Sequence, residues 1–217
     1  PFHLTLGGGF EFIGPAAHRV ALAELYIGAV EVGVGLIPGA GGNLRLLLNL
    51  IENSGKAGRL NIFPLVQKAF ETIGFAKVAT SADEAKHIGY LLKTDTVVLN
   101  NDHRIWEAKQ KAIELAENYS PPEFRDDLKL PGAGGRTAMS MALKGFKAQG
   151  KISDHDEKIG KKLSYVLTGG DKAGLTKKVD EQYLLDIERE VFVSLAGESL
   201  TQDRIRHMLK QGKPLRN

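Results

Sequence analysis

The chain has 217 residues, of which 42% are hydrophobic and 25% are charged, as in an ordinary globular protein. It has no cysteine, which excludes disulfides and thiolate chemistry and agrees with a cytoplasmic location. The uncharged runs are too short to span a membrane, and no signal-like segment opens the chain. A net charge of +3 suits an anionic ligand, but a solvated basic surface explains it more simply.

The first 34 residues predict short strands separated by a glycine-rich turn. Residues 2–6 form a predicted buried strand, and residues 8–16 follow as a short helix. Residues 18–22 are a second apolar strand candidate. Residues 26–34 alternate loosely, which indicates a strand that runs into a loop.

A second glycine-rich turn, at residues 38–42, opens a predicted helix. Its apolar stripe at helical spacing is Leu44, Leu47, Leu48 and Ile51. Residues 54–58 then read as a loop.

The middle of the chain alternates helices with one strand. Residues 64–76 form a predicted amphipathic helix, and residues 80–85 have the composition of a helix cap and first turn. A strand is expected at 96–99. A second amphipathic helix is expected at 102–119, ended by the prolines that follow.

From residue 120 onward the chain is predicted to be entirely helical. Helices are expected over 136–147, 153–166, 179–195 and 201–209, each with apolar residues on one face for packing. The predicted fold class is therefore α/β tending to mostly α, with residues 1–119 and 120–217 as two regions.

Two glutamates beside the glycine-rich turns are the candidate catalytic residues. Glu11 lies three residues after Gly8, and Glu31 precedes the second turn; the two are 20 residues apart. Backbone N–H groups at such a turn suit an oxygen that becomes an oxyanion, and two carboxylates can abstract and return protons. From the residues alone, a glycine turn with two chance glutamates explains the pattern equally well.

These residues also resemble a known family. The segments GGGFE at 7–11 and VEVGVGLIPGAGG at 30–42 resemble the signature of the crotonase superfamily, the enoyl-CoA hydratases and isomerases. The segment ATSADEAKHIGYL at 79–91 resembles a further stretch of that family. Phe10, Val30 and Ala17 depart from the residues usual there, without removing a proposed catalytic group. Compared with a simple crotonase, residues 52–63 look like an insertion.

The resemblance implies a fold, an activity and residue roles. The fold would be the C-terminal portion of a crotonase-like ββα spiral, followed by packed helices. Glu11 and Glu31 would be the catalytic carboxylates, and the Gly8 N–H would form half of the oxyanion hole. The reaction would be addition of water to a 2-enoyl-CoA in fatty-acid β-oxidation. Having both glutamates favours hydration over isomerisation.

The ending at 188–217 resembles crotonase domains fused to a 3-hydroxyacyl-CoA dehydrogenase in bacterial fatty-acid oxidation proteins. A crotonase domain normally has further strands and its other oxyanion donor before the first motif. We therefore expect this chain to be the C-terminal part of a larger polypeptide and a weak hydratase alone. On its own it should be mainly helical, with packed helices from 102 onward. Phe2, Leu4 and Leu6 should form an exposed strand edge.

The expected partners are an acyl-CoA substrate and, by family habit, further copies in a homo-oligomer. No cofactor is expected in this chain, since no dinucleotide fingerprint or P-loop is present; NAD would belong to a separate dehydrogenase domain. No pattern supports nucleic acid. The alternative is a non-catalytic helical module that scaffolds the fused enzyme or its oligomer.

Three further signals receive structural interpretations. The second PGAGG, at 131–135, is more simply a turn and helix start than a phosphate site. Residues 154–157 contain four consecutive polar ligand types that cannot converge on one metal, and Ser153 with Asp156 fits a capping box instead. His18 is more simply structural than catalytic.

Overall fold

The strands of the computed structural model form small separate sheets in the described residues, which are 1–55, 61–174 and 176–217. In the first sheet, β1 (His3–Leu6) pairs in parallel with β3 (Leu25–Gly28), and β3 pairs antiparallel with β4 (Val78–Ala79). The register places His3 opposite Leu25 and Leu6 opposite Gly28. This pairing brings the first glycine turn, directly after β1, beside the segment that follows β3.

The other strands make two-stranded pairs. β2 (Val20–Leu22) pairs in parallel with β5 (Thr96–Val98), and β6 (Leu128–Lys129) pairs antiparallel with β7 (Lys178–Val179). Strands therefore occur mainly in the first half of the chain, as predicted, but β6 and β7 show that the prediction of an entirely helical chain from residue 120 onward is wrong.

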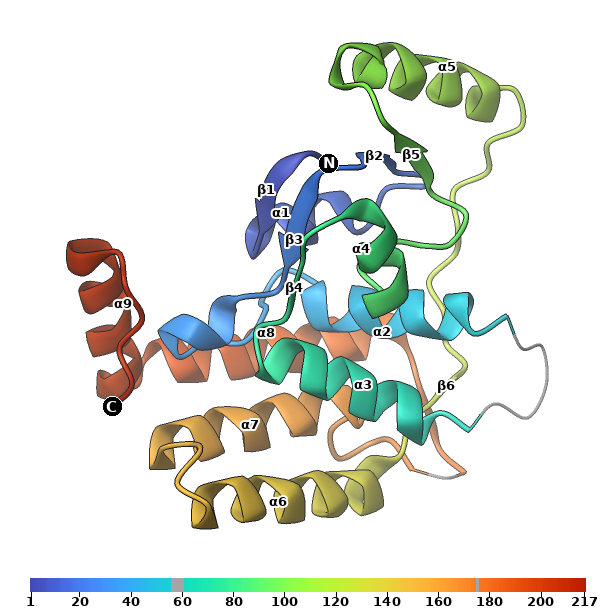
Figure 1. Cartoon of the computed structure of the whole chain (residues 1–217). Helices are drawn as coiled ribbons and strands as arrows, with labels where there is room; N and C mark the ends of the chain where they lie inside the picture. The colour runs from blue at the N-terminus through green and yellow to red at the C-terminus, as the bar shows by residue number, and fades with distance from the viewer. Residues whose placement is uncertain (56–60, 175) are drawn as a thin grey trace.

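Helices make up most of the structure (Figure 1). The first half contains α1 (Gly8–Ile13), the 3-10 turn η1 (Glu31–Val34), α2 (Gly42–Asn53), α3 (Phe63–Gly74), α4 (Ala82–Ile88), η2 (Asn101–His103) and α5 (Arg104–Ala116). The second half contains α6 (Gly132–Ala148), α7 (Asp154–Leu167), α8 (Glu181–Ala196) and α9 (Ser199–Gln211). The predicted α/β class, tending to mostly α, is confirmed.

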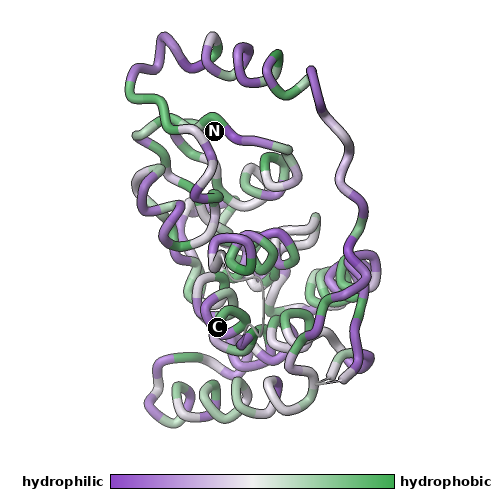
Figure 2. Tube along the Cα trace, turned by 90° about the vertical axis from the view of Figure 1, so that its right-hand side faces the viewer, coloured by the Kyte–Doolittle hydropathy of each residue, from purple (hydrophilic) through white to green (hydrophobic). Residues whose placement is uncertain are grey.

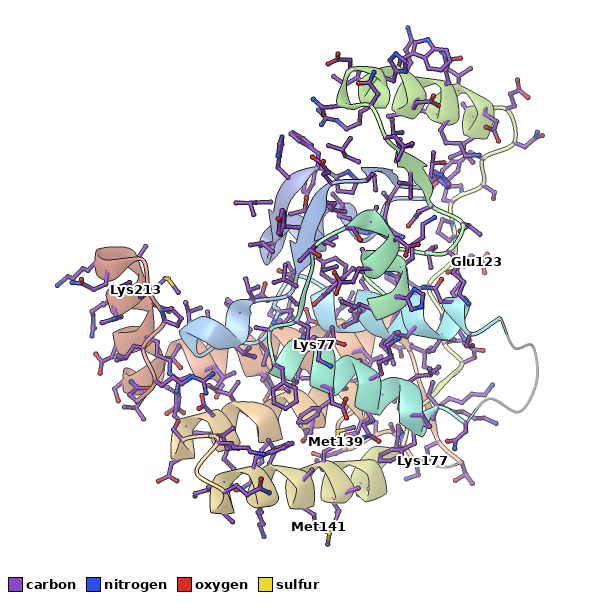
Figure 3. All side chains as sticks on the ribbon, viewed as in Figure 1. Lys77, Glu123, Met139, Met141, Lys177 and Lys213 are labelled. Carbon is purple, nitrogen blue, oxygen red and sulfur yellow. The ribbon has the colours of Figure 1, made fainter. Side chains whose placement is uncertain are left out.

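The core forms where helices of the two halves meet. α7 packs against α2, α3, α6 and α8, and the buried apolar residues of these helices belong to one cluster. Leu46, Ile73 and Leu163 are completely buried in it. On α6, Met139 is buried toward this cluster whereas Met141 is exposed on the outer side (Figure 3). The apolar stripes thus face one another, as amphipathic helices require.

Helix α5 does not pack as predicted. It lies away from the other helices, beyond β2 and β5 (Figure 1), and none of its residues is buried. Ile105 is 73% exposed and Ile113 is 52% exposed. After α5 the chain runs in an extended segment down the outside of the molecule to β6 (Figure 2). The prediction that every helix from residue 102 onward packs is therefore wrong for α5.

Strand β1 is an exposed edge rather than a buried strand. Leu4 is 73% exposed and Phe2 is 45% exposed, whereas Thr5 is buried. Among the described residues β1 pairs only with β3, so its other side is open. The prediction of a buried strand is wrong, while the expectation that Phe2 and Leu4 lie on an exposed edge agrees with the structure.

Several local predictions are confirmed. Ser153 and Asp156 form a reciprocal capping box at the start of α7, and the Ser81 side chain caps α4. The residues beside Asp156 have separate structural partners, since His155 bonds Thr201 and Glu157 pairs with lysines. The second PGAGG begins α6, as expected for a helix start.

Two sequence predictions concern segments that the structure describes only in part. The proposed insertion at 52–63 and the loop at 54–58 both include residues 56–60, which lie outside the described ranges. In the part that is described, no helix is both long and apolar enough to cross a bilayer.

Candidate active site

Gly7 allows the first turn to approach Glu31. Its φ of 55° lies in the left-handed region, which glycine adopts without strain. A Cβ atom at this position would lie 3.1 Å from Oε1 of Glu31. The Gly7 N–H donates to the carbonyl of Gly28, at 2.7 Å, which fixes the turn against β3. The turn therefore depends on a residue without a side chain.

Gly8 begins α1 and is exposed. A Cβ atom built on it would have no heavy atom within 4 Å, so the space beside its backbone is open. Within the described ranges, no hydrogen bond engages its N–H group. This is the environment that an N–H donor aimed at a substrate oxygen needs.

Glu11 is held by the start of α2. Its Oε1 accepts hydrogen bonds from the N–H groups of Ala40, at 2.7 Å, and Gly42, at 3.0 Å. Gly42 must remain small, because a Cβ atom there would lie 2.9 Å from that same oxygen. The two glycine-rich motifs, separate in sequence, therefore meet at this carboxylate.

Glu31 is the carboxylate with an unsatisfied oxygen. Its Oε2 is buried and has no hydrogen-bond partner among the described residues. Burial raises the pKa of Glu31 to about 7; the Glu11 charge adds to this, and the N–H groups of Glu31 and Val30 act in the opposite direction. A buried carboxyl oxygen without a partner is costly, and a carboxyl with a strongly shifted pKa is a candidate for a functional site.

A third carboxylate, Glu188 on α8, lies at the same helix start. Its Oε1 accepts from the Gly41 N–H at 2.5 Å, and its Oε2 accepts from the Asn43 N–H at 3.2 Å. The N–H groups of residues 40 to 43 thus alternate between Glu11 and Glu188. Burial raises the pKa of Glu188 to about 7, and the Glu11 charge adds to it. Four backbone donors therefore fix Glu11 and Glu188 relative to each other.

Sequence reasoning missed Glu188. The available signal is its position on α8, where it lies on the same helical face as Leu184, Val191 and Leu195, all of which are buried. An acidic residue inside an apolar stripe needs a hydrogen-bonded partner. This rule predicts that Glu188 is hydrogen-bonded, but it does not predict which groups bind it.

The C-terminal helices also hold η1, the turn that carries Glu31. The Thr201 hydroxyl donates to the carbonyl of Gly35, at 2.9 Å, directly after η1. His155 of α7 bonds the same hydroxyl oxygen at 2.9 Å. Thr201 is fully buried and His155 is 3% exposed. Residues beyond 120 therefore position the candidate site as well as covering the core.

A buried ion pair fixes the far end of α1. Arg19 and Asp95 approach to 2.9 Å, with side-chain exposures of 3% and 0%. Arg19 also donates to the carbonyls of Ile13 and Gly14 at the end of α1. Close by, the His18 ring nitrogen bonds the Thr96 hydroxyl at 2.9 Å, which fits its predicted structural role.

The unusual Phe10 fits the fold without entering the site. It is completely buried and packs edge-on against Tyr90, with ring centroids 4.9 Å apart. The Tyr90 hydroxyl in turn accepts from the Ala29 N–H, at 3.0 Å, two residues before Glu31. The larger side chain therefore supports the segment that carries Glu31.

Comparison with known proteins begins with the fold. No model of a protein family matches the chain. The solved structure of carnitinyl-CoA hydratase from Mycobacterium avium is similar, with a TM-score of 0.54 and 16% identity over 98% of this chain and 59% of that one. An enoyl-CoA hydratase/isomerase from Pseudoalteromonas atlantica T6c gives 0.54 and 14% identity over 99% and 62%. The chain has the crotonase fold. The fold that the resemblance of the two glycine-rich motifs implies is thereby confirmed.

A sequence relative links this crotonase-like chain to a longer protein. The chain is 46% identical, over its whole length, to a protein of Bacillus subtilis (strain 168) named "Probable 3-hydroxyacyl-CoA dehydrogenase". It spans only 27% of that relative. The relative's name therefore describes a protein nearly four times as long, and its activity does not transfer directly to these residues.

Proposed function

We propose that this chain carries the hydratase site of an enoyl-CoA hydratase-type enzyme, within a protein that also bears a 3-hydroxyacyl-CoA dehydrogenase. The reaction is the reversible syn addition of water across the 2,3 double bond of an enoyl-CoA in fatty-acid β-oxidation. It needs no cofactor in this chain, and NAD would serve only the dehydrogenase. The crotonase fold and the named relative support the general class.

Each residue has one role in the proposed reaction. The Gly8 N–H donates to the thioester oxygen as negative charge develops on it. Glu11 takes a proton from the water whose oxygen bonds to C3. Glu31 gives its proton to C2, which completes the addition. Glu188 touches no substrate in this scheme; it holds the N–H groups next to those that hold Glu11.

The observation that carries the proposal is the state of Glu31. A general acid works best when its pKa lies near the working pH, and burial raises the pKa of Glu31 to about 7. Its buried Oε2 lacks a partner, and Gly7 lies so close to the other oxygen, Oε1, that a side chain there would crowd the carboxyl. A proton donor with an unpartnered oxygen and an open backbone N–H group on the neighbouring turn are two of the groups that hydration requires.

The direct test is hydration of crotonyl-CoA, followed by loss of enoyl-thioester absorbance, in the protein as its gene encodes it. Glu31→Gln keeps the shape of the side chain but cannot supply the proton. Hydration should fall by about 10²–10⁴-fold. Near-normal turnover by this variant would show that Glu31 is not the proton donor.

A helical scaffold remains the second candidate, and two exposed apolar surfaces favour it. One is the face of α5 with Ile105, Trp106 and Ile113; the other is the open edge of β1 with Leu4. Both could cover another part of the protein or a second copy in the expected homo-oligomer. The scaffold is the better description if both Glu31→Gln and Glu11→Gln leave hydration unchanged.

We expect the enzyme to work in the cytoplasm.

A further inference from the structure

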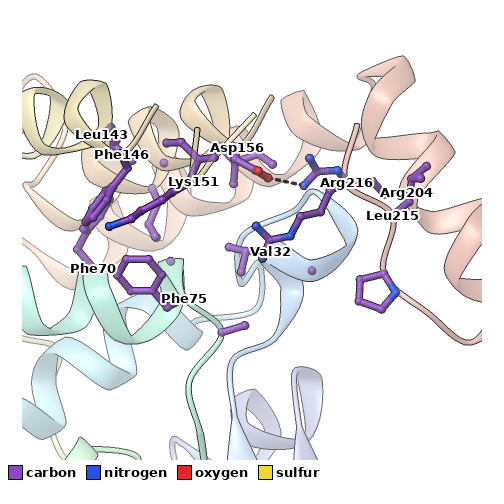
Figure 4. A pocket seen from close by; sticks show the side chains of 18 residues that line it. Val32, Phe70, Phe75, Leu143, Phe146, Lys151, Asp156, Arg204, Leu215 and Arg216 are labelled. Carbon is purple, nitrogen blue, oxygen red and sulfur yellow. Dashed lines mark hydrogen bonds and ion pairs between the residues drawn. The ribbon is translucent and has the colours of Figure 1, made fainter. Parts of the chain in front are cut away.

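A cavity lies beside η1, which contributes Val32 and Gly33 to its lining. Its volume is about 600 Å³, and its walls come from η1, α3, α6, α7 and the segment after α9 (Figure 4). Sites for small molecules typically occupy about 300–1,000 Å³. The cavity is therefore large enough to hold an organic molecule, and none of the residues assigned to catalysis lines it.

The walls are mostly hydrocarbon. The large apolar side chains include Phe70, Phe75, Leu143, Phe146, Ile159 and Leu163. Phe75 and Phe146 meet edge to face at one end, with ring centroids 5.7 Å apart. Such walls offer few hydrogen bonds, so they exclude sugars and nucleotides and favour an alkyl chain.

The charged residues of the lining are mainly cationic. Arg204 is paired with Asp156, the lining's carboxylate, at 2.7 Å. Lys151 and Arg216 are exposed, and neither makes an ion pair among the described residues. The Lys151 ammonium lies 5.8 Å from the Phe146 ring centre, at the border of the apolar wall (Figure 4). The cavity thus combines an apolar interior with unneutralised positive charge.

We propose that this cavity binds a long-chain fatty carboxylate. The alkyl chain would lie between α3, α6 and α7, and the carboxylate would meet Lys151 and Arg216. An acyl-CoA whose thioester lies at Gly8 would present only the uncharged methyl end of its chain to Lys151 and Arg216. The proposal goes beyond the hydration reaction and does not depend on it.

The cavity also borders the segment that carries Glu31. Val32 and Gly33 line it, and they are the next two residues of η1. A bound chain would contact this turn. Fatty carboxylate binding would therefore reach the backbone of the candidate site without entering the site itself.

Isothermal titration calorimetry with octanoate, decanoate, dodecanoate and tetradecanoate tests the proposal. Each added pair of buried methylenes should tighten binding by about tenfold until the cavity is full, with one site per chain. Dodecyltrimethylammonium, which has the same chain and the opposite charge, should bind at least tenfold more weakly than dodecanoate. Absence of dodecanoate binding, or equal binding of the two head groups, would overturn the proposal.

Matched variants place the binding in this cavity. Lys151→Glu combined with Arg216→Glu should weaken dodecanoate binding by at least tenfold. Lys144→Glu combined with Lys129→Glu makes the same charge change at two exposed lysines outside the lining and should change it less than twofold. Equal effects of these changes would mean that the anion meets only the general charge of the surface.

A filling variant tests the apolar interior. Gly74 lines the cavity, and a Cβ atom there meets only Leu163, at 3.8 Å. Gly74→Leu should therefore remove dodecanoate binding while keeping the fold, which circular dichroism checks. If this variant does not fold, the paired charge variants still decide the matter. Crotonyl-CoA hydration, measured in all of them, should stay unchanged, so failure here leaves the proposed function standing.

Discussion

Burial raises the pKa of both Glu31 and Glu188, but the two carboxylates have different hydrogen-bond partners. Burial raises the pKa of each to about 7, and the charge of Glu11 adds to both. Both oxygens of Glu188 accept backbone N–H groups at the start of α2. The buried Oε2 of Glu31 has no partner in the described part of the chain.

The comparison shows that a raised pKa does not by itself identify a catalytic residue. Desolvation acts on any buried carboxyl, whether its oxygens are used by the fold or are available to a substrate. The hydrogen bonds that each carboxylate accepts distinguish Glu188 from Glu31. Both oxygens of Glu188 bind the start of α2, whereas one oxygen of Glu31 has no partner among the described residues. The predictions below test this distinction.

The largest expected effect is the loss of hydration activity when glutamine replaces Glu31. Glu31→Gln should lower kcat for crotonyl-CoA hydration by about 10²–10⁴-fold, because a proton donor is lost. Glu188→Gln is the matched control and should lower kcat by no more than about tenfold, since Glu188 exchanges no proton in the reaction. Steady-state kinetics with both variants settle the comparison. Equal losses of kcat in the two variants would mean that an unpartnered oxygen does not mark the catalytic glutamate.

A double variant tests whether Glu11 and Glu31 act together. Glu11→Gln should cost about as much as Glu31→Gln, about 10²–10⁴-fold, for the same reason. Combining them should cost far less than the product of the single losses, because groups that act as a unit are strongly non-additive. Single-turnover rates for the three variants measure this. Strict multiplication of the two losses would show that the two glutamates act independently.

Removal of the carboxylates should affect stability in the opposite order. Glu188→Leu leaves the N–H groups of Gly41 and Asn43 buried without acceptors, at about 1–3 kcal/mol each, so unfolding should become easier by about 2–5 kcal/mol. Glu31→Leu removes a buried oxygen that has no partner and should change stability by less than about 1 kcal/mol or increase it. Urea denaturation with an unchanged m-value measures both. A larger loss at Glu31 would reverse the assignment.

The sequence predicted what depends on local signals. The capping box of Ser153 and Asp156, and the start of α2 at the Gly-rich turn, follow from neighbouring residues alone. The placement of Glu11 against Ala40 and Gly42 is non-local, but the resemblance brought both motifs to one site. Local chemistry and family pattern together were sufficient for these elements.

The periodicity of apolar residues did not predict which helices pack against another element. α5 and α7 both have apolar stripes, yet α7 buries eight residues and α5 buries none. A stripe specifies which face is apolar, whereas the partner is set by the three-dimensional path of the chain. Glu188 was missed for the same reason, since its partners lie about 145 residues earlier in the chain. The exposed side of β1 likewise reflects its place at a sheet edge.

The smallest expected effect, and the most specific, is on the pH dependence of stability. A carboxyl whose folded pKa is raised binds its proton more tightly in the native state than in the unfolded state. Its contribution is therefore fully present below the unfolded pKa of about 4.5 and is lost as the pH rises through the folded pKa of about 7.

The free energy of unfolding of each Gln variant, minus that of the wild type, should thus rise between pH 5 and 8. The rise should be at most about 3 kcal/mol for Glu31→Gln, and similar for Glu188→Gln. Burial lowers the pKa values of His18 and His155, and their contribution to the pH dependence of stability has the opposite sign. That contribution is common to the wild type and the variants, so it cancels in the difference.

Glu31→Gln and Glu188→Gln should differ in their free energy of unfolding, although its change with pH should be similar for both. Glu188→Gln replaces one acceptor oxygen by an amide that faces an N–H group, so it should lie below Glu31→Gln at every pH. Chemical denaturation at pH 5, 6, 7 and 8 gives both quantities. A flat difference for Glu31→Gln would mean that its carboxyl is solvated in solution, and the pKa near 7 that supports its role as a general acid would then be wrong.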